Sequence, residues 1–333
     1  MFEFIKSQKI NLFFFILIGS IFYFLIESLN WKYFIGTSSE IFGDFKENLS
    51  WLNCNYLNFK VYEDNTCAFK TNYGPALFLI PYNEGLKIFY ENYLPYILIY
   101  SFLLVSISIN NPKRSFEMIV VFFLLINTST FLLVERLNFD ILIFLALIFV
   151  VYNKFYLFNW SIILFFGLAK IYPFILGLNI FLENKLRNLR NLLFIMLCLL
   201  IITLLYLFIY LDEYKHVLFS NPASAGLHMV FTIKSAPKII KYLFDINYIF
   251  TLPIMLVLFY LFNRYLISNL INQNIEKYIN LFSSKTNLFL LSGLIITICY
   301  VIFSNYIYRE VFFISTIPLF FYILKMDDTK LVK

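Results

Sequence analysis

Four short polar clusters in this sequence contain residue types that could carry chemistry. They are Gly43-Asp44-Phe45, Glu135-Arg136-Leu137-Asn138-Phe139-Asp140, Lys170-Ile171-Tyr172-Pro173 and Asn305-Tyr306-Ile307-Tyr308-Arg309-Glu310. A single carboxylate such as Asp44 suits a general base, which takes the proton of an attacking hydroxyl. Lys170, Arg136 and Arg309 supply cations that neutralise a phosphate and hydrogen-bond its oxygens. Together these groups suit the transfer of a sugar from a lipid-linked sugar phosphate, because the cations stabilise the charge growing on the leaving phosphate.

Asp44 competes with other acids of the same stretch for the role of base. Those acids are Glu40, Glu47, Glu63 and Asp64. From position alone, Asp44 is as well explained as one solvated carboxylate among several.

The basic residues and their neighbours also have structural explanations. Asn138 could cap the helix that follows it, and Arg136 could pair with Asp140 four positions later on one helix face. Arg309 could extend to a membrane interface from the end of a span. Lys170 is harder to explain in this way, because a charge in the middle of an apolar block is costly and usually faces a cavity or a partner.

The composition places these clusters in a membrane protein. Of 333 residues, 61% are hydrophobic and 14% are charged, and the mean hydropathy is +0.78. A soluble fold needs more charge to cover its surface. The apolar stretches are about 18–22 residues long, which is the length that crosses a bilayer core. These observations exclude soluble enzymes, nucleic-acid binders and disordered scaffolds.

The sequence predicts an all-α polytopic bundle of about eight transmembrane helices, in one domain covering 1–333. The expected spans are 10–29, 93–110, 116–134, 139–152, 191–211, 248–267, 287–304 and 311–324. The connecting segments include a long first extracytoplasmic loop at 30–92 and a second large one at 212–247. Both termini are expected in the cytoplasm, because this topology makes the cytoplasmic segments net positive and the outer segments net negative.

The block 157–182 is expected to form a re-entrant hairpin. It is interrupted at Gly167, Pro173 and Gly177. Pro173 lacks a backbone donor and disfavours helical geometry at Tyr172, the residue before it. A straight helix here would move every later loop to the other side and invert the positive-inside rule.

The four cysteines fit this topology. Cys54 and Cys67 lie in the first outer loop, where an oxidising compartment favours a disulfide between them, with two free thiols as the alternative. Cys198 and Cys299 lie in expected spans as small apolar residues. The sequence has only two histidines and no CxxC, so a zinc site or a Ser-His-Asp triad is poorly supported.

In their order and common sidedness, the four clusters resemble the GT-C superfamily of membrane glycosyltransferases. The likeness is greatest to the bacterial mannosyltransferases that use polyprenol-phosphate-mannose, and Asn72-Tyr73-Gly74-Pro75 resembles the loop before their second span. The resemblance implies an inverting hexosyltransferase of the bacterial inner membrane. Its partners would be a polyprenyl-phosphate sugar donor, a glycan or glycolipid acceptor and the lipid bilayer, without nucleic acid. No cofactor or required metal is implied, and a divalent cation stays an alternative.

On this resemblance, Asp44 matches the catalytic base, and Lys170, Arg309 and Arg136 match positions that bind the donor phosphate. The supporting residues are Glu135, Asn138, Asp140, Tyr172 and Tyr308. Many relatives are longer, with more spans or a soluble C-terminal domain, and neither is expected from this sequence.

Three other functions fit parts of the pattern. A transporter or flippase for a lipid-linked sugar would use the intramembrane charge and the broken helix, but the chain has no matching halves. An oligosaccharide polymerase or ligase would use similar cations, but its large outer loop typically comes late in the chain. A non-enzymatic assembly subunit would leave Lys170 without a role.

Overall fold

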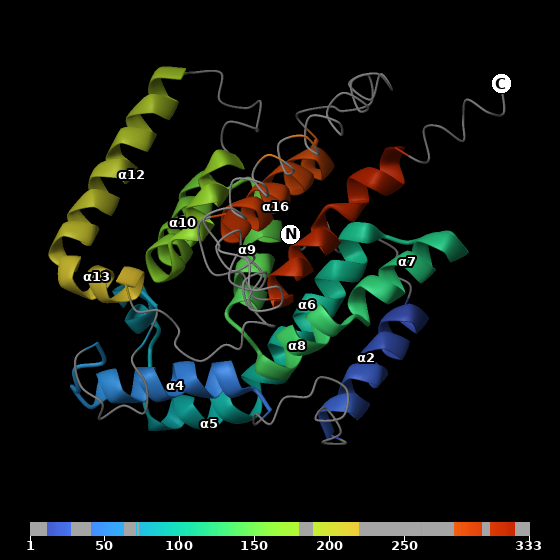
Figure 1. The fold of residues 1–333 in the computed structure, drawn as a ribbon, viewed down its shortest axis with the longest axis horizontal. Helices are drawn as coiled ribbons and strands as arrows, with labels where there is room; N and C mark the ends of the chain where they lie inside the picture. The colour runs from blue at the N-terminus through green and yellow to red at the C-terminus, as the bar shows by residue number, and fades with distance from the viewer. Residues whose placement is uncertain are drawn as a thin grey trace.

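The structure, a computed structural model, describes residues 12–27, 41–62, 71, 73–179, 189–219, 257, 261, 283–301 and 307–323. These residues are mostly helical and contain no strand (Figure 1). The α-helices are α2 (Leu12–Glu27), α4 (Gly43–Tyr56), α5 (Glu84–Asn92), α6 (Leu94–Asn110), α7 (Ser115–Leu125), α8 (Thr128–Arg136), α9 (Asp140–Tyr152), α10 (Tyr156–Lys170), α12 (Leu189–Ile209), α13 (Leu211–Phe219) and α16 (Ser284–Val301). The 3-10 helices are η1 (Pro75–Leu79), η2 (Tyr172–Leu178) and η5 (Ile307–Ser315).

Helix α9 lies at the centre of the bundle and packs against α6, α10, α16 and η5. Phe144 of α9 is fully buried between two other aromatic rings. Its ring centroid lies 5.2 Å from that of Phe102 on α6 and 6.1 Å from that of Phe312 on η5. These edge-to-face and tilted contacts join segments that are about 200 positions apart in the sequence.

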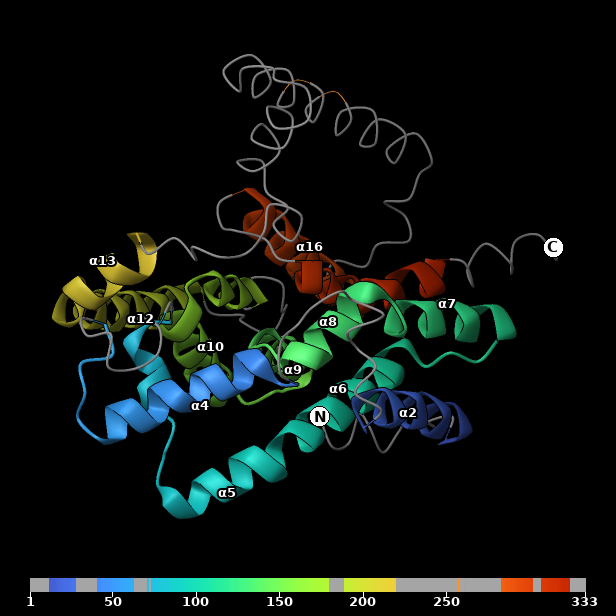
Figure 2. The same ribbon diagram turned by 60° about the horizontal axis from the view of Figure 1, so that its bottom comes forward.

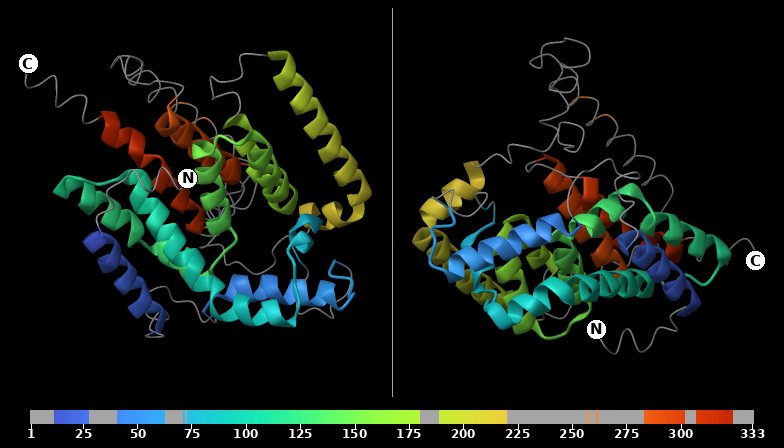
Figure 3. Two further views of the ribbon diagram at one scale, coloured as in Figure 1. Left: turned by 180° about the vertical axis from the view of Figure 1, so that it is seen from behind. Right: turned by 90° about the horizontal axis from the view of Figure 1, so that it is seen from below.

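Helices α4 and α5 lie next to each other at one end of the bundle (Figures 1, 2 and 3). The sequence predicts an outer loop at 30–92, and its described part is largely helical. Helix α4 buries one face, made of Asn48, Leu49, Trp51, Leu52 and Cys54. The apolar members of this face explain why a polar stretch folds onto the bundle instead of remaining extended in solvent.

Where side chains are described, no single helix is both long and apolar enough to cross a membrane. Three pairs of consecutive helices meet these criteria together, by length and composition, but each pair is bent. The bend is 45° between α5 and α6, 49° between α7 and α8, and 85° between the described part of α12 and α13.

Two of the expected spans are not single straight α-helices, and whether they cross a bilayer stays a prediction. The stretch 116–134 is divided between α7 and α8, because Asn127 donates to Leu124 O (3.0 Å) and accepts from Thr130 N–H (2.7 Å), which starts a new helix. The stretch 311–324 begins inside the 3-10 helix η5, where the Ser315 hydroxyl bonds back to Phe312 O. The expected spans 93–110 and 139–152 coincide with α6 and α9. Most of the expected span 248–267 lies outside the described residues.

The chain reverses direction between α10 and η2. Ile171 joins them with φ 34° and ψ −58°, a conformation that is rare for a β-branched residue. A Cβ at Gly167 would lie 2.6 Å from the Phe174 ring, and one at Gly177 would lie 3.8 Å from the Trp160 ring. The two arms therefore lie against each other. The absence of a side chain at Gly167 allows the close approach, whereas a Cβ at Gly177 would make only an ordinary contact. That this hairpin enters a bilayer from one side stays a prediction.

Candidate functional site

Helix ends bring four charged side chains together. Asp44 and Asp140 lie in the first turns of α4 and α9, and Arg136 and Lys170 lie in the last turns of α8 and α10. Each sign matches the helix dipole, since carboxylates are favoured at helix N-termini and cations at C-termini. The start of α4 is joined to α8 by a hydrogen bond from Phe42 N–H to the carbonyl oxygen of Glu135, 2.6 Å long.

Asp44 is held through both of its carboxylate oxygens. Arg136 Nε lies 2.8 Å from Asp44 Oδ1, and Asn138 Nδ2 donates to Asp44 Oδ2 at 2.5 Å. Each oxygen of a carboxylate can accept more than one hydrogen bond. Asp44 can therefore accept a further hydrogen bond from another donor.

Asp140 is fully buried and has three partners. Lys170 Nζ lies 2.6 Å from Asp140 Oδ1, and Arg309 Nε lies 3.1 Å from Asp140 Oδ2. The hydroxyl of Tyr172 also donates to Asp140 Oδ1. A carboxylate without solvent contact requires such compensation, because burying an isolated charge is very costly.

Asn138 connects the two halves of this arrangement. Its Nδ2 donates to Asp44, and its Oδ1 accepts from Lys170 Nζ at 3.3 Å and from the Asp140 backbone N–H at 3.1 Å. We call the five charged residues the ionic cluster: Asp44, Arg136, Asp140, Lys170 and Arg309. Three cations and two carboxylates give these five side chains one net positive charge.

The members of the ionic cluster differ in their access to solvent. The side chains of Arg136, Lys170 and Asp44 are 33%, 15% and 15% exposed, whereas those of Arg309 and Asp140 are 8% and 0% exposed. The first three are therefore partly accessible, Arg136 most of all. Asp140 and Arg309 lie behind them.

Tyr73 covers the buried side of the ionic cluster. Lys170 Nζ lies 5.2 Å from the centroid of its ring, within the range of a cation–π contact. Trp51 and Phe139 pack against the same ring. Burial raises the pKa of Tyr73 well above 10.0, and the nearby charges of Asp140 and Asp44 raise it further. Tyr73 is thus a neutral hydroxyl at this site.

Glu47 lies one turn after Asp44 on α4. Burial raises the pKa of Glu47 above 4.5, and the charge of Asp44 adds to this effect while Arg136 opposes it. Glu47 consequently keeps its proton to higher pH than an ordinary glutamate. The other competing acids, Glu40, Glu63 and Asp64, lie outside the described residues.

Two of the structural explanations from sequence are wrong. Arg136 does not pair with Asp140, because α8 ends at Arg136 and α9 begins at Asp140, with Leu137 in a left-handed conformation between them. Arg309 is not an interfacial residue: it is buried and bound to Asp140. Asn138 does bond to the N-terminal backbone of α9, in addition to its contacts with the ionic cluster.

Two further residues that the sequence predicts at the site are Glu135 and Tyr308. Glu135 is buried next to the start of α4. Tyr308 belongs to η5, and its side chain lies outside what the structure describes.

Cys54 is disulfide-bonded, and Cys67 lies outside the described residues. Cys198 and Cys299 are free thiols. Among the described residues, no group of three or more His, Cys, Asp or Glu side chains is placed to hold a metal ion.

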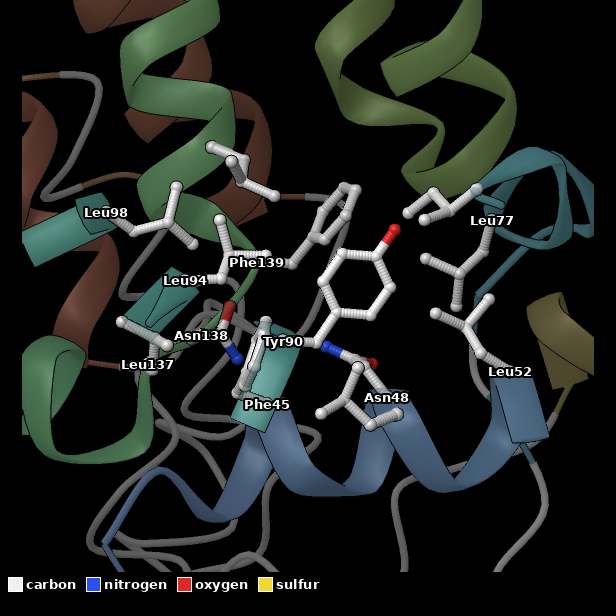
Figure 4. A pocket seen from close by; sticks show the side chains of 13 residues that line it. Phe45, Asn48, Leu52, Leu77, Tyr90, Leu94, Leu98, Leu137, Asn138 and Phe139 are labelled. Atoms are coloured by element: carbon white, nitrogen blue, oxygen red, sulfur yellow. The ribbon is translucent and has the colours of Figure 1, made fainter. Parts of the chain in front are cut away.

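An apolar cavity of about 70 Å³ lies next to the ionic cluster and shares Asn138 with it (Figure 4). Its lining residues are Phe45, Asn48, Leu49, Leu52, Leu77, Ile80, Tyr90, Leu94, Leu98, Leu137, Asn138, Phe139 and Leu142. They come from α4, η1 and the residue after it, the α5–α6 pair, the link between α8 and α9, and the first turn of α9. The cavity offers hydrocarbon contact beside a charged site.

Sequence reasoning missed three residues at this site. Asn48 follows Asp44 by four positions, so a helix over this stretch would have placed both on one face. Tyr73 lies within the Asn72-Tyr73-Gly74-Pro75 stretch, but the pattern there indicates no role for its ring. Cys299 is hydrogen-bonded to Arg309, a contact that no local pattern predicts.

No family model, curated protein or solved structure matches the chain.

Proposed function

We propose that this chain is an integral-membrane glycosyltransferase of the GT-C type. It transfers a hexose from a polyprenyl-phosphate donor to a hydroxyl of a glycan or glycolipid acceptor on the extracytoplasmic face. The observation that carries this proposal is the joining of Asp44 to Arg136 and, through Asn138, to Lys170. A carboxylate beside two accessible cations is what this reaction requires.

The reaction proceeds with inversion at the anomeric carbon. Asp44 takes the proton of the acceptor hydroxyl while the hydroxyl oxygen bonds to the anomeric carbon. The bond between that carbon and the phosphate oxygen breaks, and its electron pair stays on the phosphate. Arg136 and Lys170 stabilise this growing negative charge.

Arg309 and Asp140 have a different part in this proposal. Arg309 binds Asp140, and Asp140 in turn binds Lys170 at the end of α10. Arg309 therefore positions the donor-binding lysine through a shared carboxylate. This differs from the direct phosphate contact that the resemblance implies for Arg309.

The exposed apolar surface supports a bilayer location. Among the described side chains of α12, these large apolar ones are at least half-exposed: Leu197, Leu200, Ile202, Leu204, Leu205, Phe208 and Ile209. The helix lies at the outer edge of the bundle (Figures 1 and 3). Such a surface is a liability in water and is stable against lipid.

The test is Asp44→Asn in the full-length chain, reconstituted in lipid vesicles with a polyprenyl-phosphate hexose. Loss of a general base lowers rates by about 10²–10⁴-fold, and we expect a fall of this size in donor consumption. Asp212→Asn is the matched control, because Asp212 is an exposed carboxylate that also forms an ion pair with a cationic side chain, Lys215. An unchanged rate in Asp44→Asn would remove Asp44 as the base and move the role to Glu47 or another acid of this stretch.

A transporter for a lipid-linked sugar is the second candidate. The observation that favours it is the discontinuous α10–η2 pair with Lys170 at its break, a geometry that transporters use at binding sites. Donor consumption separates the two functions, since a transporter moves its substrate without cleaving the sugar–phosphate bond.

A further inference from the structure

Two buried asparagines attach both arms of the α10–η2 hairpin to one carbonyl group of α9. Asn159 lies in the first turn of α10, and Asn179 directly follows η2. The Nδ2 atom of Asn159 lies 3.3 Å from Val150 O, and that of Asn179 lies 3.2 Å from the same oxygen. The two side chains are buried, at 5% and 2% exposure. We call these two asparagines and Val150 O the amide clamp.

The end of α9 explains why a buried carbonyl group needs these donors. Val150 lies in the last turn of α9, where carbonyl groups have no partner within the helix. Asn159 also donates to Asn153 O at 3.0 Å. Since carbonyl oxygens only accept hydrogen bonds, both contacts determine the orientation of the Asn159 amide. One amide would be enough to satisfy Val150 O, but here each arm of the hairpin supplies one.

The ionic cluster holds the hairpin at its other end, so α9 supports it twice. Lys170 and Tyr172, on either side of the chain reversal, both bind Asp140 in the first turn of α9. Between Asp140 and Val150, α9 rises about 15 Å over ten positions. Between Asn159 and Lys170, α10 rises about 16 Å over eleven positions. The two helices pack against each other, so these equal lengths place both pairs of contacts in one register.

The second arm has nearly the same length as the first. From Tyr172 to Asn179 the chain covers seven positions, mainly as the 3-10 helix η2, which rises about 14 Å. Each arm therefore reaches both attachment points on α9. A slip of α10 by one helical turn would move Lys170 about 5 Å away from Asp140. The amide clamp opposes this slip, because Asn159 would also leave Val150 O.

We propose that Asn159 and Asn179 are positioning residues for Lys170. They fix the register of the hairpin on α9 and thereby hold the Lys170 ammonium group where it meets a prenyl-linked phosphate. The role of Lys170 in binding phosphate rests on the proposed function. The attachment of the hairpin to α9 at both ends does not.

The experiment measures the binding of farnesyl phosphate to the full-length chain in phosphatidylcholine vesicles. Farnesol, which lacks the phosphate, is the second probe. We expect Asn159→Leu to raise the Kd of farnesyl phosphate about tenfold, the value of one hydrogen bond to a charged group. The Kd of farnesol should not change, because Lys170 contributes nothing to an uncharged ligand. A general loss of structure would weaken the binding of both probes.

Asn110→Leu is the matched control. Asn110 is also 5% exposed, and its amide also donates to two carbonyl oxygens, Ser106 O at 2.8 Å and Ile314 O at 3.2 Å. These contacts join α6 to η5 instead of the hairpin to α9. The same substitution at this position should therefore leave the Kd of both probes unchanged.

A double-mutant cycle shows whether the amide clamp acts through Lys170. Lys170→Ala alone should raise the Kd of farnesyl phosphate, and adding Asn159→Leu to it should cause no further increase. If Asn159→Leu does not fold, Asn179→Leu provides the same cycle, since it leaves Asn159 bound to Val150 O.

Three results would overturn the proposal. They are equal weakening of the two probes, a further loss when the asparagine variant is added to Lys170→Ala, and an unchanged Kd of farnesyl phosphate in the asparagine variants or in Lys170→Ala. Binding of farnesyl phosphate requires no turnover, so it is independent of the transferase reaction. If the cycle behaves as expected while Asp44→Asn has no effect on donor consumption, the amide clamp stands and the transferase fails. The opposite pair of results removes the amide clamp and retains the transferase.

Discussion

At the scale of single residues, Asp140 is the centre of the site, although the sequence gives greater prominence to Asp44. It is fully buried and binds two cations and a tyrosine hydroxyl. Removing one partner of a buried ion pair leaves an uncompensated charge, which usually costs more than the pair contributes. Asp140 thereby fixes the positions of Lys170 and Arg309.

We therefore predict that Asp140→Asn destabilises the protein by about 3–5 kcal/mol, because Lys170 and Arg309 lose their carboxylate in a buried setting. Thermal unfolding of the detergent-solubilised protein measures this change. Asp212→Asn, on the exposed face of α13, should change stability by less than about 0.5 kcal/mol. If Asp140→Asn unfolds at the same temperature as the unaltered protein, the ionic cluster does not hold these helices together.

At the scale of elements, the end of α10 is completed by two other segments. The last carbonyl groups of a helix have no partner within it. Here Ala169 O accepts from Gly74 N–H at 2.8 Å, and Leu168 O accepts from the Tyr214 hydroxyl at 2.5 Å. The segment before η1 and helix α13 therefore fix the position from which Lys170 reaches the ionic cluster.

Gly74 is required by the close approach of these segments. A Cβ at this position would lie 2.1 Å from Leu168 O, which is backbone and cannot move aside cheaply. We predict that Gly74→Ala costs about 1–3 kcal/mol, the usual range for overpacking, and also lowers donor consumption because Lys170 moves.

Gly293→Ala is the matched control for Gly74→Ala. Gly293 lies within α16, and a Cβ added there would have no neighbouring atom within 4 Å, so alanine should stabilise the helix by about 1 kcal/mol. If the unfolding temperatures of Gly74→Ala and Gly293→Ala change in the same direction, this account of Gly74 is wrong.

At the scale of the whole molecule, the proposal depends on which side of a bilayer the ionic cluster faces. Cys54 reports on this, because it lies on α4, the helix that begins beside Asp44. Its disulfide suits an oxidising compartment. The side on which Cys54 lies is therefore the side on which Asp44 lies.

Reduction releases the thiols of Cys54 and of its disulfide partner, so we predict that a membrane-impermeant maleimide added to intact cells labels the chain only after reduction. The variant used carries Cys198→Ala and Cys299→Ala, which removes the two free thiols. Labelling of this variant without reduction would contradict the disulfide. Labelling only after cell lysis would place α4 in the cytoplasm and contradict the proposed location of Asp44 on the extracytoplasmic side.

Sequence reasoning predicted the helical class, the polar residues of the site and the interruption of the block at 157–182. These features depend on interactions within a few turns of chain: apolar stretches favour helices, and Pro173 disrupts one locally. The charges at the ends of α4, α8, α9 and α10 follow the same local rule, since each matches a helix dipole.

Only the tertiary structure decided which charges meet. Asp140 binds Arg309 across 169 positions, while Arg136 binds Asp44 rather than the nearer Asp140. It also decided that Asn48 lines an apolar cavity. Ion pairs and cavities form between segments brought together by packing. A local sequence pattern contains the charges and amides, but their partners depend on how the helices pack around α9.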